Sequence, residues 1–416
     1  MENRYDKYKD SGIAWIGEIP EHWEIVCLKR LSKISTGNQD TQDSTPDGKY
    51  PFFVRSPKVE KSNRYTFEGP SILMAGDGVG AGKIFHLADN KFACHQRVYC
   101  INQLSKINRI FLFYYLSSLF YNIIDSANSK STVDSVRLPM LAEFPICIPL
   151  DIEQQTIAAY LDQKCGEIDE LITLQEKMIT KLQSYKQSVI TEAVTKGLDK
   201  NVPLKDSGIE WIGEIPEHWE VKRLKYFGNN YNGLTYSPND ICSSQEGIIV
   251  LRSSNIKDNK LCFDDNVYVN KEIPTKLLVN KGDILICSRN GSASLIGKAA
   301  LIETDIKATF GAFMMIFRGN NICHKYLYYI VTSCISQYKW LFTTATINQL
   351  TSSMLGEIFA PFICNKLEQQ SIADYLDQRC SEIDELISIK QQKIEKLKEY
   401  KKSLIFECVT GKRKVS

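Results

Sequence analysis

Two long segments with a coiled-coil period dominate the hydrophobic pattern of this chain. In each, apolar residues recur at alternating three- and four-residue steps for about four heptads, the a/d pattern of a coiled-coil helix. These seam positions are Ala158, Leu161, Cys165, Ile168, Ile172, Ile179, Leu182 and Val189 in the first segment, and Ala373, Leu376, Cys380, Ile383, Ile387, Ile394, Leu397 and Leu404 in the second. The pattern predicts two helices of roughly 40 residues, each about 60 Å long.

Polar residues interrupt the two seams at matching points. Gln175 in the first segment corresponds to Lys390 in the second, and Lys186 corresponds to Lys401. Polar residues at such positions commonly fix the register and the partner of a helix. The pattern therefore favours pairing of the two helices, antiparallel if the two halves of the chain are related by a two-fold axis. The alternative is that each helix packs only on its own neighbouring domain.

The chain contains an internal duplication. Residues 9–24 (KDSGIAWIGEIPEHWE) match residues 205–220 at fifteen of sixteen positions, with an offset of 196. The twenty residues from Glu153 match those from Glu368 at sixteen positions, with an offset of 215. We call these matched blocks the frame. Residues 25–150 and 221–365, the two inserts, share little sequence, although both have a strand-rich texture with scattered turn residues.

Charge is divided between frame and inserts. Each insert contains 15 Lys/Arg and 10 Asp/Glu, a net charge of +5, so the rest of the chain carries +2 − 10 = −8. A basic excess in the variable segments suits contact with phosphates. With 43% apolar and 24% charged residues, the composition is that of a globular protein. The apolar runs are too short to cross a membrane and the first residues do not resemble a secretory signal, so we expect a cytoplasmic protein without a membrane partner.

Motifs for catalysis are missing from the sequence. The glycine-rich stretch GDGVGAGK at 76–83 resembles a phosphate-binding loop, but Ile84 stands where Ser or Thr is required, which favours a glycine-rich hairpin. The sequence has no methyltransferase Asn-Pro-Pro-Tyr motif, no H-E-x-x-H and no G-x-S-x-G. The thirteen cysteines are scattered without C-x-x-C spacing, so we predict no metal site. We therefore expect a non-catalytic chain that binds and positions.

The frame resembles the specificity (S) subunits of type I restriction-modification systems. The resemblance rests on the W-I-G-E-I-P-x-H-W blocks at Trp15 and Trp211 and on the E-Q-Q-x-I-A-x-Y-L-D blocks at Glu153 and Glu368, and it extends over the whole chain in order. It implies two target recognition domains, each reading one half of a split DNA site. The helices would set the spacing of the halves and dock two modification (methyltransferase) subunits, with restriction subunits as further partners. S-adenosylmethionine, ATP and Mg²⁺ would belong to those partner subunits, and this chain would hold no cofactor.

The predicted fold is α+β, with two α/β target recognition domains joined by two long helices in an antiparallel coiled coil, as a pseudo-two-fold repeat. We expect the first recognition domain with its frame segment at 1–150 and the central spacer helix at 151–204. The second recognition domain is expected at 205–366, and the C-terminal spacer helix at 367–416.

Candidate DNA-binding residues are Arg, Lys, Asn and Gln side chains in Gly/Ser/Asn-rich loops, where base edges and phosphates can be reached. In the first insert they are Arg55, Lys58, Lys83, Gln96, Arg97, Lys130 and Arg137; in the second they are Arg252, Asn255, Arg289, Asn290, Lys298, Asn348 and Gln349. Among these candidates we favour the Ser-Arg-Asn-Gly loop at 288–291 as the segment that contacts DNA bases. A competing hypothesis is a coiled-coil protein-interaction scaffold without DNA recognition. A self-contained methylase or nuclease is disfavoured by the missing motifs.

Overall fold

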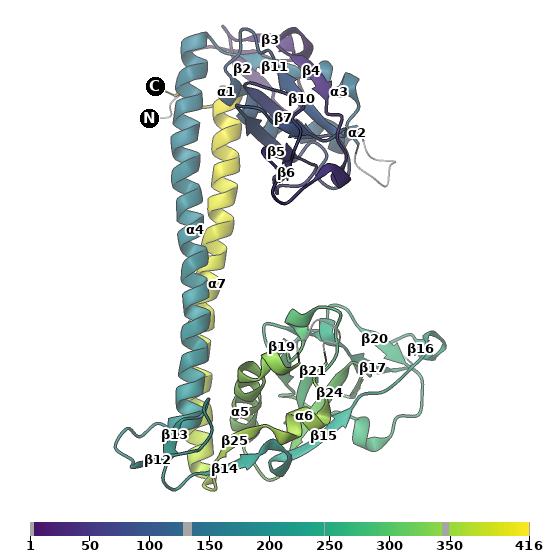
Figure 1. Ribbon diagram of the computed structural model, residues 1–416, viewed down its shortest axis with the longest axis vertical. Helices are drawn as coiled ribbons and strands as arrows, with labels where there is room; N and C mark the ends of the chain where they lie inside the picture. Colours follow the sequence, from purple (N-terminus) through teal and green to yellow (C-terminus); the bar gives the residue numbers. More distant parts are fainter. Residues whose placement is uncertain (1–3, 128–134, 245, 343–348, 416) are drawn as a thin grey trace. The chain divides into compact units, whose positions relative to one another are not determined.

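The computed structural model describes residues 4–127, 135–244, 246–342 and 349–415. The chain divides into two compact units. Unit 1 comprises Met1–Lys177 and Lys390–Ser416, and unit 2 comprises Met178–Ile389. Each unit therefore combines one insert with parts of both long helices (Figure 1). Among the described helices, none combines the length and the hydropathy that a membrane-spanning segment needs.

Unit 1 is built on a four-stranded antiparallel sheet with the order β4-β10-β7-β8, next to a three-stranded sheet with the order β6-β5-β9. Its strands are β1 (Tyr8–Asp10), β2 (Glu18–Pro20), β3 (Glu24–Cys27), β4 (Lys33–Thr36), β5 (Tyr50–Phe53), β6 (Glu60–Ser62), β7 (Ser71–Ala75), β8 (Phe85–Ala88), β9 (Ala93–Cys94), β10 (Val98–Asn102) and β11 (Pro145–Ile148). Its α-helices are α1 (Arg109–Leu119), α2 (Tyr121–Ala127), α3 (Leu138–Ala142), the first part of α4 (Asp151–Lys196) and the last part of α7 (Lys366–Val409). β7 and β8 form the hairpin predicted for the glycine-rich stretch.

Unit 2 repeats this plan, with the order β15-β24-β21-β22 in one sheet and β16-β20-β17-β23 in the other. Its strands are β12 (Leu204–Asp206), β13 (Glu214–Pro216), β14 (Glu220–Arg223), β15 (Gly228–Asn232), β16 (Ile241–Cys242), β17 (Ile248–Leu251), β18 (Ile256–Lys257), β19 (Lys260–Leu261), β20 (Val267–Val269), β21 (Ile284–Cys287), β22 (Ala299–Leu301), β23 (Ala308–Phe310), β24 (Met314–Gly319) and β25 (Phe359–Phe362). Its α-helices are α5 (His324–Gln337), α6 (Ser352–Glu357), the last part of α4 and the first part of α7 (Lys366–Val409). The β18–β19 hairpin lies in the longer second insert.

Strand pairing corrects one detail of the predicted fold class. Among the strand pairs of the described residues, only β5–β9 and β17–β23 are parallel. From β3 to β10 and from β14 to β24, no α-helix stands between consecutive strands of the described residues, so the helical crossovers typical of parallel strands are missing there. The prediction of mixed helix and sheet is confirmed, but the sheet domain of each unit is of the α+β class and not the α/β class.

The ends of the long helices follow local sequence signals. Asn365 caps α7 because its side-chain oxygen accepts a hydrogen bond from the backbone N–H of Leu367 at 2.9 Å. After the last residues of α4 and α7, Gly197 and Gly411 adopt φ values of +72° and +70°. This left-handed conformation stops a helix and is easiest for glycine.

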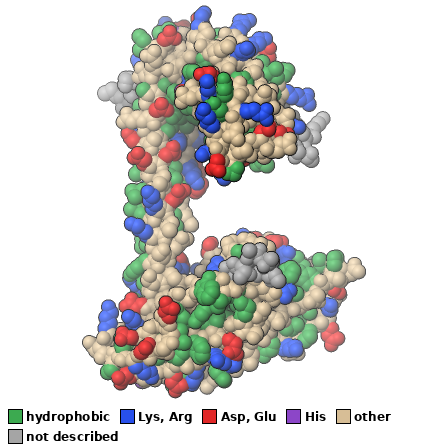
Figure 2. All heavy atoms as spheres, viewed as in Figure 1, with side chains coloured by type: hydrophobic (Ala, Val, Ile, Leu, Met, Phe, Trp, Pro, Cys, Tyr) green, Lys and Arg blue, Asp and Glu red, His purple; other side chains and the backbone are tan. Residues whose placement is uncertain are grey.

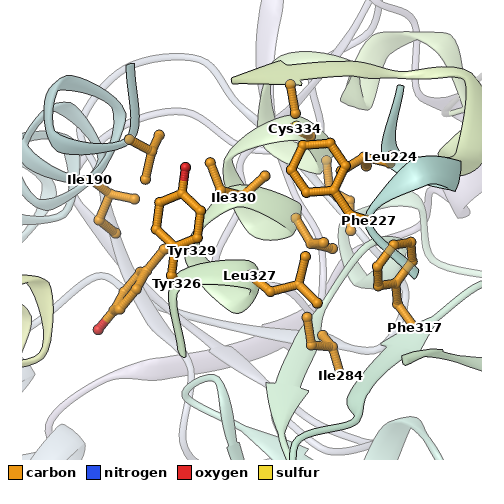
Figure 3. Close-up of a cluster of buried hydrophobic side chains, with 14 of the residues drawn as sticks. Ile190, Leu224, Phe227, Ile284, Phe317, Tyr326, Leu327, Tyr329, Ile330 and Cys334 are labelled. Atoms are coloured by element: carbon orange, nitrogen blue, oxygen red, sulfur yellow. The ribbon is translucent and has the colours of Figure 1, made fainter. Parts of the chain in front are cut away.

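In unit 1 the N-terminal part of α4 packs both on its own domain and on the C-terminal part of α7. Leu161 and Ile168 share one core with Phe144 of the domain and with Leu404 of α7. The corresponding core of unit 2 joins Val189 and Ile190 of α4 to Leu376 and Cys380 of α7, and also to side chains of α5 (Figure 3). The two packing alternatives left open by the sequence therefore occur together within each unit.

The seam positions are all buried or half-buried, whereas most of the residues between them are exposed. The polar seam residues find partners on the other helix. In unit 1 the Lys401 ammonium lies 2.7 Å from the Asp169 carboxylate, and that of Lys390 lies 3.4 Å from the Gln175 amide oxygen. In unit 2 the Lys186 ammonium donates to Asp384 at 2.6 Å. In unit 1, Asp169 of α4 contacts Lys401 of α7, and Gln175, further along α4, contacts Lys390, which comes earlier in α7. The two helices therefore run antiparallel there.

The two repeated sequence blocks contact each other within each unit. The imidazole Nε2 of His22 lies 2.8 Å from a carboxylate oxygen of Glu153, and that of His218 lies 3.1 Å from Glu368. Glu368 also accepts the indole N–H of the fully buried Trp219 at 2.9 Å. These histidines therefore link the frame segment to the start of the long helix, a structural role.

Candidate nucleic-acid interface

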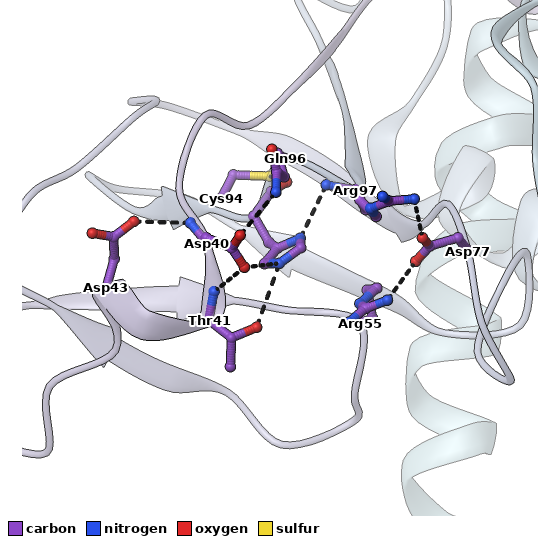
Figure 4. A network of polar contacts seen from close by, with 9 residues as sticks. Asp40, Thr41, Asp43, Arg55, Asp77, Cys94, Gln96 and Arg97 are labelled. Atoms are coloured by element: carbon purple, nitrogen blue, oxygen red, sulfur yellow. Dashed lines mark hydrogen bonds and ion pairs between the residues drawn. The ribbon is translucent and has the colours of Figure 1, made fainter.

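Two arginines from separate segments converge on Asp77 in unit 1 (Figure 4). Arg55, which follows β5, donates from Nη1 to one carboxylate oxygen of Asp77 at 2.9 Å, and Arg97, which precedes β10, donates to the other oxygen at 2.8 Å. The Asp77 side chain is only 16% exposed, whereas those of Arg55 and Arg97 are 44% and 62% exposed. We call these three residues the Asp77 clamp. It holds two guanidinium groups at a fixed separation while leaving other N–H groups on each available.

A buried histidine supports the turn that carries Arg97. His95 accepts a hydrogen bond from the backbone N–H of Arg97 at its Nδ1, 3.0 Å away, so the ring proton resides on Nε2. Nε2 faces Asp40 at 3.3 Å, and Asp40 also accepts from the Gln96 amide at 3.0 Å. The backbone N–H of Thr41, followed by His95, holds the pKa of Asp40 below its usual value. The carboxylate stays ionised and fixes the Gln96 side chain.

A groove of about 720 Å³ lies beside the clamp. Arg55 and Asp77 line it together with Lys83, whose ammonium sits 4.2 Å from the centre of the Tyr121 ring. Val79, at the tip of the glycine-rich hairpin, also lines the groove and is 93% exposed. Val54, Pro57 and Ile84 make the rest of the lining largely apolar, and Glu60 adds a second carboxylate. The groove thus combines the donors of Arg55 and Lys83 with apolar and acidic side chains.

Among the described residues of unit 1, four of the predicted candidates lie at or beside the clamp and two do not. Figure 2 shows basic and acidic side chains next to one another on the visible face of this unit. Arg55, Lys83, Gln96 and Arg97 lie at or beside the clamp. Lys58 and Arg137 are exposed, in the loop after β5 and at the start of α3, and Lys130 lies outside the described residues.

In unit 2 the favoured loop begins where β21 ends. Arg289 is exposed and forms an antiparallel bridge with Gln349. The Asn290 amide lies 3.4 Å from the hydroxyl of Ser253, and Lys298 is half-buried after the loop. Asn348 lies outside the described residues. Arg289, Asn290 and Gln349 are therefore brought together, as a reading surface requires.

The structure argues against Asn255 as a base-contacting residue. Its side chain is fully buried, and its amide donates to the backbone oxygens of Cys262 at 3.0 Å and Asp265 at 3.2 Å. Its oxygen accepts the backbone N–H of Arg252. Arg252 itself pairs with the Asp265 carboxylate at 2.8 Å. Asn255 shapes this loop from inside, because every hydrogen bond it makes ties two parts of the loop together.

The two units place different side chains at equivalent backbone positions. In unit 1 the backbone N–H of Gly76, just after β7, donates to the carbonyl of Arg97 at 2.9 Å. In unit 2 the backbone N–H of Ser288, just after β21, donates to the carbonyl of Phe313 at 2.9 Å. Phe313, which is 65% exposed, thus takes the place of Arg97.

One residue further along, Asp77 of unit 1 corresponds to Arg289 of unit 2. Each forms an isolated antiparallel bridge. Asp77 pairs with Ser135, in the segment before α3, and Arg289 pairs with Gln349, in the segment before α6. Sequence reasoning missed Asp77 and Phe313 because neither is a typical base reader by residue type. Two short stretches of the otherwise different inserts, ILMAGD (72–77) and ILICSR (284–289), resemble each other, and their alignment gives a sequence signal for the pair.

Comparison with known proteins agrees with the duplicated plan. The sequence profile described as the type I restriction modification DNA specificity domain matches residues 20–184 and 216–399, and these two copies fit two target recognition domains. The chain is 25% identical to the type I restriction enzyme MjaVIII specificity subunit of Methanocaldococcus jannaschii over 421 residues, which cover 95% of this chain and 94% of that protein. It is 29% identical to the EcoDI specificity subunit of Escherichia coli over 223 residues, half of this chain and 49% of that protein.

A solved structure also shares the fold. A chain from a study of complex assembly and conformational transition of the type I R-M system aligns with a TM-score of 0.70 at 15% identity, covering 94% of this chain and 99% of that one. Two matches of the family profile along one chain, together with the same sheet built twice, lead to one assignment: the chain belongs to the family of type I restriction-modification specificity subunits.

Proposed function

We propose that this chain reads a bipartite DNA sequence for a type I restriction-modification complex. One recognition domain, residues 1–150, reads one half of the site, and the other, residues 205–366, reads the second half. The observation that carries the proposal is that two equivalent sheets place different side chains at matching positions, with Asp77 and Arg97 in one and Arg289 and Phe313 in the other. Two surfaces of one design with different chemistry suit two different half-sites.

The long helices were predicted at 151–204 and 367–416, whereas α4 ends at Lys196 and α7 at Val409, before the predicted ends. In this proposal they act as an antiparallel coiled coil that sets the spacing of the half-sites and docks two modification subunits. Its support is that every seam position is buried or half-buried, together with the repeated Lys–Asp pairs, Lys401 with Asp169 and Lys186 with Asp384. The frame would then be related by a pseudo-two-fold axis, because each residue of one pair lies 215 positions from its counterpart in the other.

Chemistry belongs to the partners in this proposal. The modification subunits would bring S-adenosylmethionine, and restriction subunits would bring ATP and Mg²⁺, in a cytoplasmic complex on double-stranded DNA. The chain itself is proposed to be non-catalytic. This agrees with the missing motifs, and the described residues contain no group of three His, Cys, Asp or Glu side chains placed to hold a metal ion.

The proposal is tested with the chain assembled with its modification subunits. We expect methylation of adenines in a split motif, and DNA binding whose affinity falls steeply with salt because phosphate contacts release counterions. Arg289→Ala should relax one base position at a cost of about 1–3 kcal/mol. The control is Lys257→Ala, which removes an exposed lysine of β18 that pairs with Asp264. An assembled complex that neither methylates DNA nor binds it in a salt-dependent way would instead support a protein-interaction scaffold.

A further inference from the structure

We infer that the Asp77 clamp makes unit 1 a guanine reader, with Arg55 and Arg97 each presenting a guanidinium edge to a G·C base pair in the major groove. This inference rests on the proposed function, because it names the bases that one recognition domain selects. The half-site read by unit 1 then contains two G·C pairs, one for each arginine.

The geometry leaves each arginine equipped for this contact. The Nη1 atom of each guanidinium donates to the Asp77 carboxylate, so Nη2 and Nε remain as donors on each exposed side chain. Guanine offers N7 and O6 as adjacent acceptors in the major groove, and two parallel donors of one arginine match them. Lysine presents a single ammonium group, which can contact N7 and O6 but lacks the two parallel donors of a guanidinium, so it should select guanine less strongly.

Asp77 acts here as a positioning residue. Exposed ion pairs contribute little to stability, so stability alone gives a weak reason for drawing two arginines from different segments onto one carboxylate. The carboxylate instead restricts both flexible side chains before DNA arrives, which lowers the ordering cost of binding. Because both guanidinium groups touch one carboxylate, they reach neighbouring base pairs, which are about 3.4 Å apart along the duplex. The two G·C pairs should therefore lie within about three consecutive base pairs.

The surroundings of the clamp fit a duplex rather than a small ligand. The adjacent groove is open and is bordered by the exposed Val79, an apolar group of the kind that contacts a thymine methyl. Lys83 borders the same groove and adds a positive charge suited to a phosphate.

Unit 2 lacks the clamp at its matching positions in the described part of the chain. Arg289 stands in the place of Asp77 and Phe313 in the place of Arg97, so no carboxylate there gathers two arginines. The paired guanine preference is therefore assigned to unit 1 alone.

The test uses the full chain assembled with its modification subunits and maps methylated adenines on a DNA library by sequencing. Arg55→Lys and Arg97→Lys keep the charge and should each relax one G·C position of the same half-site. We expect the preference for G·C at that position to fall roughly five- to a hundredfold, while the other half-site is unchanged. Asp77→Asn should relax both positions together, a readout that a merely structural ion pair would not produce. Arg64→Lys is the matched control, since Arg64 is 84% exposed and pairs weakly with Asp43 at 3.8 Å.

The outcomes separate this inference from the proposed function. A split motif with no G·C pair in either half would overturn the inference without any variant, and it would leave the proposed function intact. Lysine variants that methylate the unchanged motif with unchanged selectivity would also overturn it. If the assembled wild-type complex methylates no DNA, the proposed function fails first. Thermal melting of each variant confirms that a change in motif does not arise from unfolding.

Discussion

We expect the buried ion pair between Asp283 and Arg318 in unit 2 to contribute more to stability than any other polar contact near the candidate DNA-binding loop at 288–291. Asp283 immediately precedes β21, its side chain is 2% exposed, and it accepts two hydrogen bonds from Arg318 of β24, at 2.8 Å from Nε and 2.7 Å from Nη2. Asp283 also raises the pKa of Arg318 through these hydrogen bonds. The same strand, β21, ends at Cys287, two residues before Arg289.

Asp283→Ala removes both hydrogen bonds from Arg318 and also the one from the backbone N–H of Asn280 at 2.7 Å. It leaves the Arg318 guanidinium, which is 23% exposed, without its counter-ion. Breaking one side of a buried pair costs about 3–5 kcal/mol. We expect a loss of about 3 kcal/mol, the lower end, because water reaches part of Arg318 and its Nη2 keeps the carbonyl of Leu278 at 2.9 Å.

Unit 1 supplies the matched control. In the antiparallel pairing, Ile284 opposes Phe317 in unit 2 as Ile72 opposes Ile101 in unit 1, so Ser71 and Asn102 of unit 1 stand where Asp283 and Arg318 stand in unit 2. The double variant Asp283→Ser/Arg318→Asn removes both charges and should cost at least about 1 kcal/mol less than Asp283→Ala.

Hydrogen exchange of the β21 and β24 amides, followed by mass spectrometry, measures the opening free energy of unit 2 separately from that of unit 1. The reasoning is refuted if Asp283→Ala lowers that free energy by less than about 1 kcal/mol, or if the double variant is as damaging as the single one.

Three further predictions concern packing, anchoring and thiol reactivity. Leu161→Ala, at a fully buried seam position, should lower the free energy of unfolding of unit 1 by about 2–5 kcal/mol in urea denaturation; a smaller loss would mean that the seam is loosely packed there. Tyr114→Phe removes the 2.9 Å hydrogen bond from the phenol to Asp162 of α4 and should cost about 1–2 kcal/mol in the same assay, whereas no loss would show that the contact does not anchor the helix. Iodoacetamide at pH 8 should alkylate the exposed Cys364 and spare Cys334, whose pKa is raised by burial; equal labelling in native protein would contradict the buried placement.

The helices were predictable position by position because their signal is local. A heptad seam depends only on spacing along the chain, and every residue chosen for it, from Ala158 to Leu404, is buried or half-buried. The glycine-rich hairpin was predictable for the same reason, since its departure from a phosphate-binding loop was visible at Ile84.

The proposed DNA-reading surface of unit 1 was only partly predictable, because it joins distant segments. Arg55, Asp77 and Arg97 come from three loops about twenty residues apart, and no spacing rule brings them together. Asn255 was predicted to contact DNA from its residue type alone. An asparagine in a polar loop can either bind DNA or hydrogen-bond within its own loop, and Asn255 does the latter. Only the folded hydrogen bonds distinguish the two uses.

The division between frame and inserts has a physical basis in where each kind of contact lies. Residues of one frame block contact residues of the other, as Trp219 contacts Glu368. A change in one block therefore leaves a side chain in the other block without its hydrogen-bond partner. Asp77 and Arg289 instead follow the ends of equivalent strands, and their backbone bridges persist although the side chains carry opposite charges. Because a backbone bridge does not depend on the side chain, such positions tolerate exchange at little cost in stability. A recognition domain built this way changes the bases it reads while the frame that holds it stays the same.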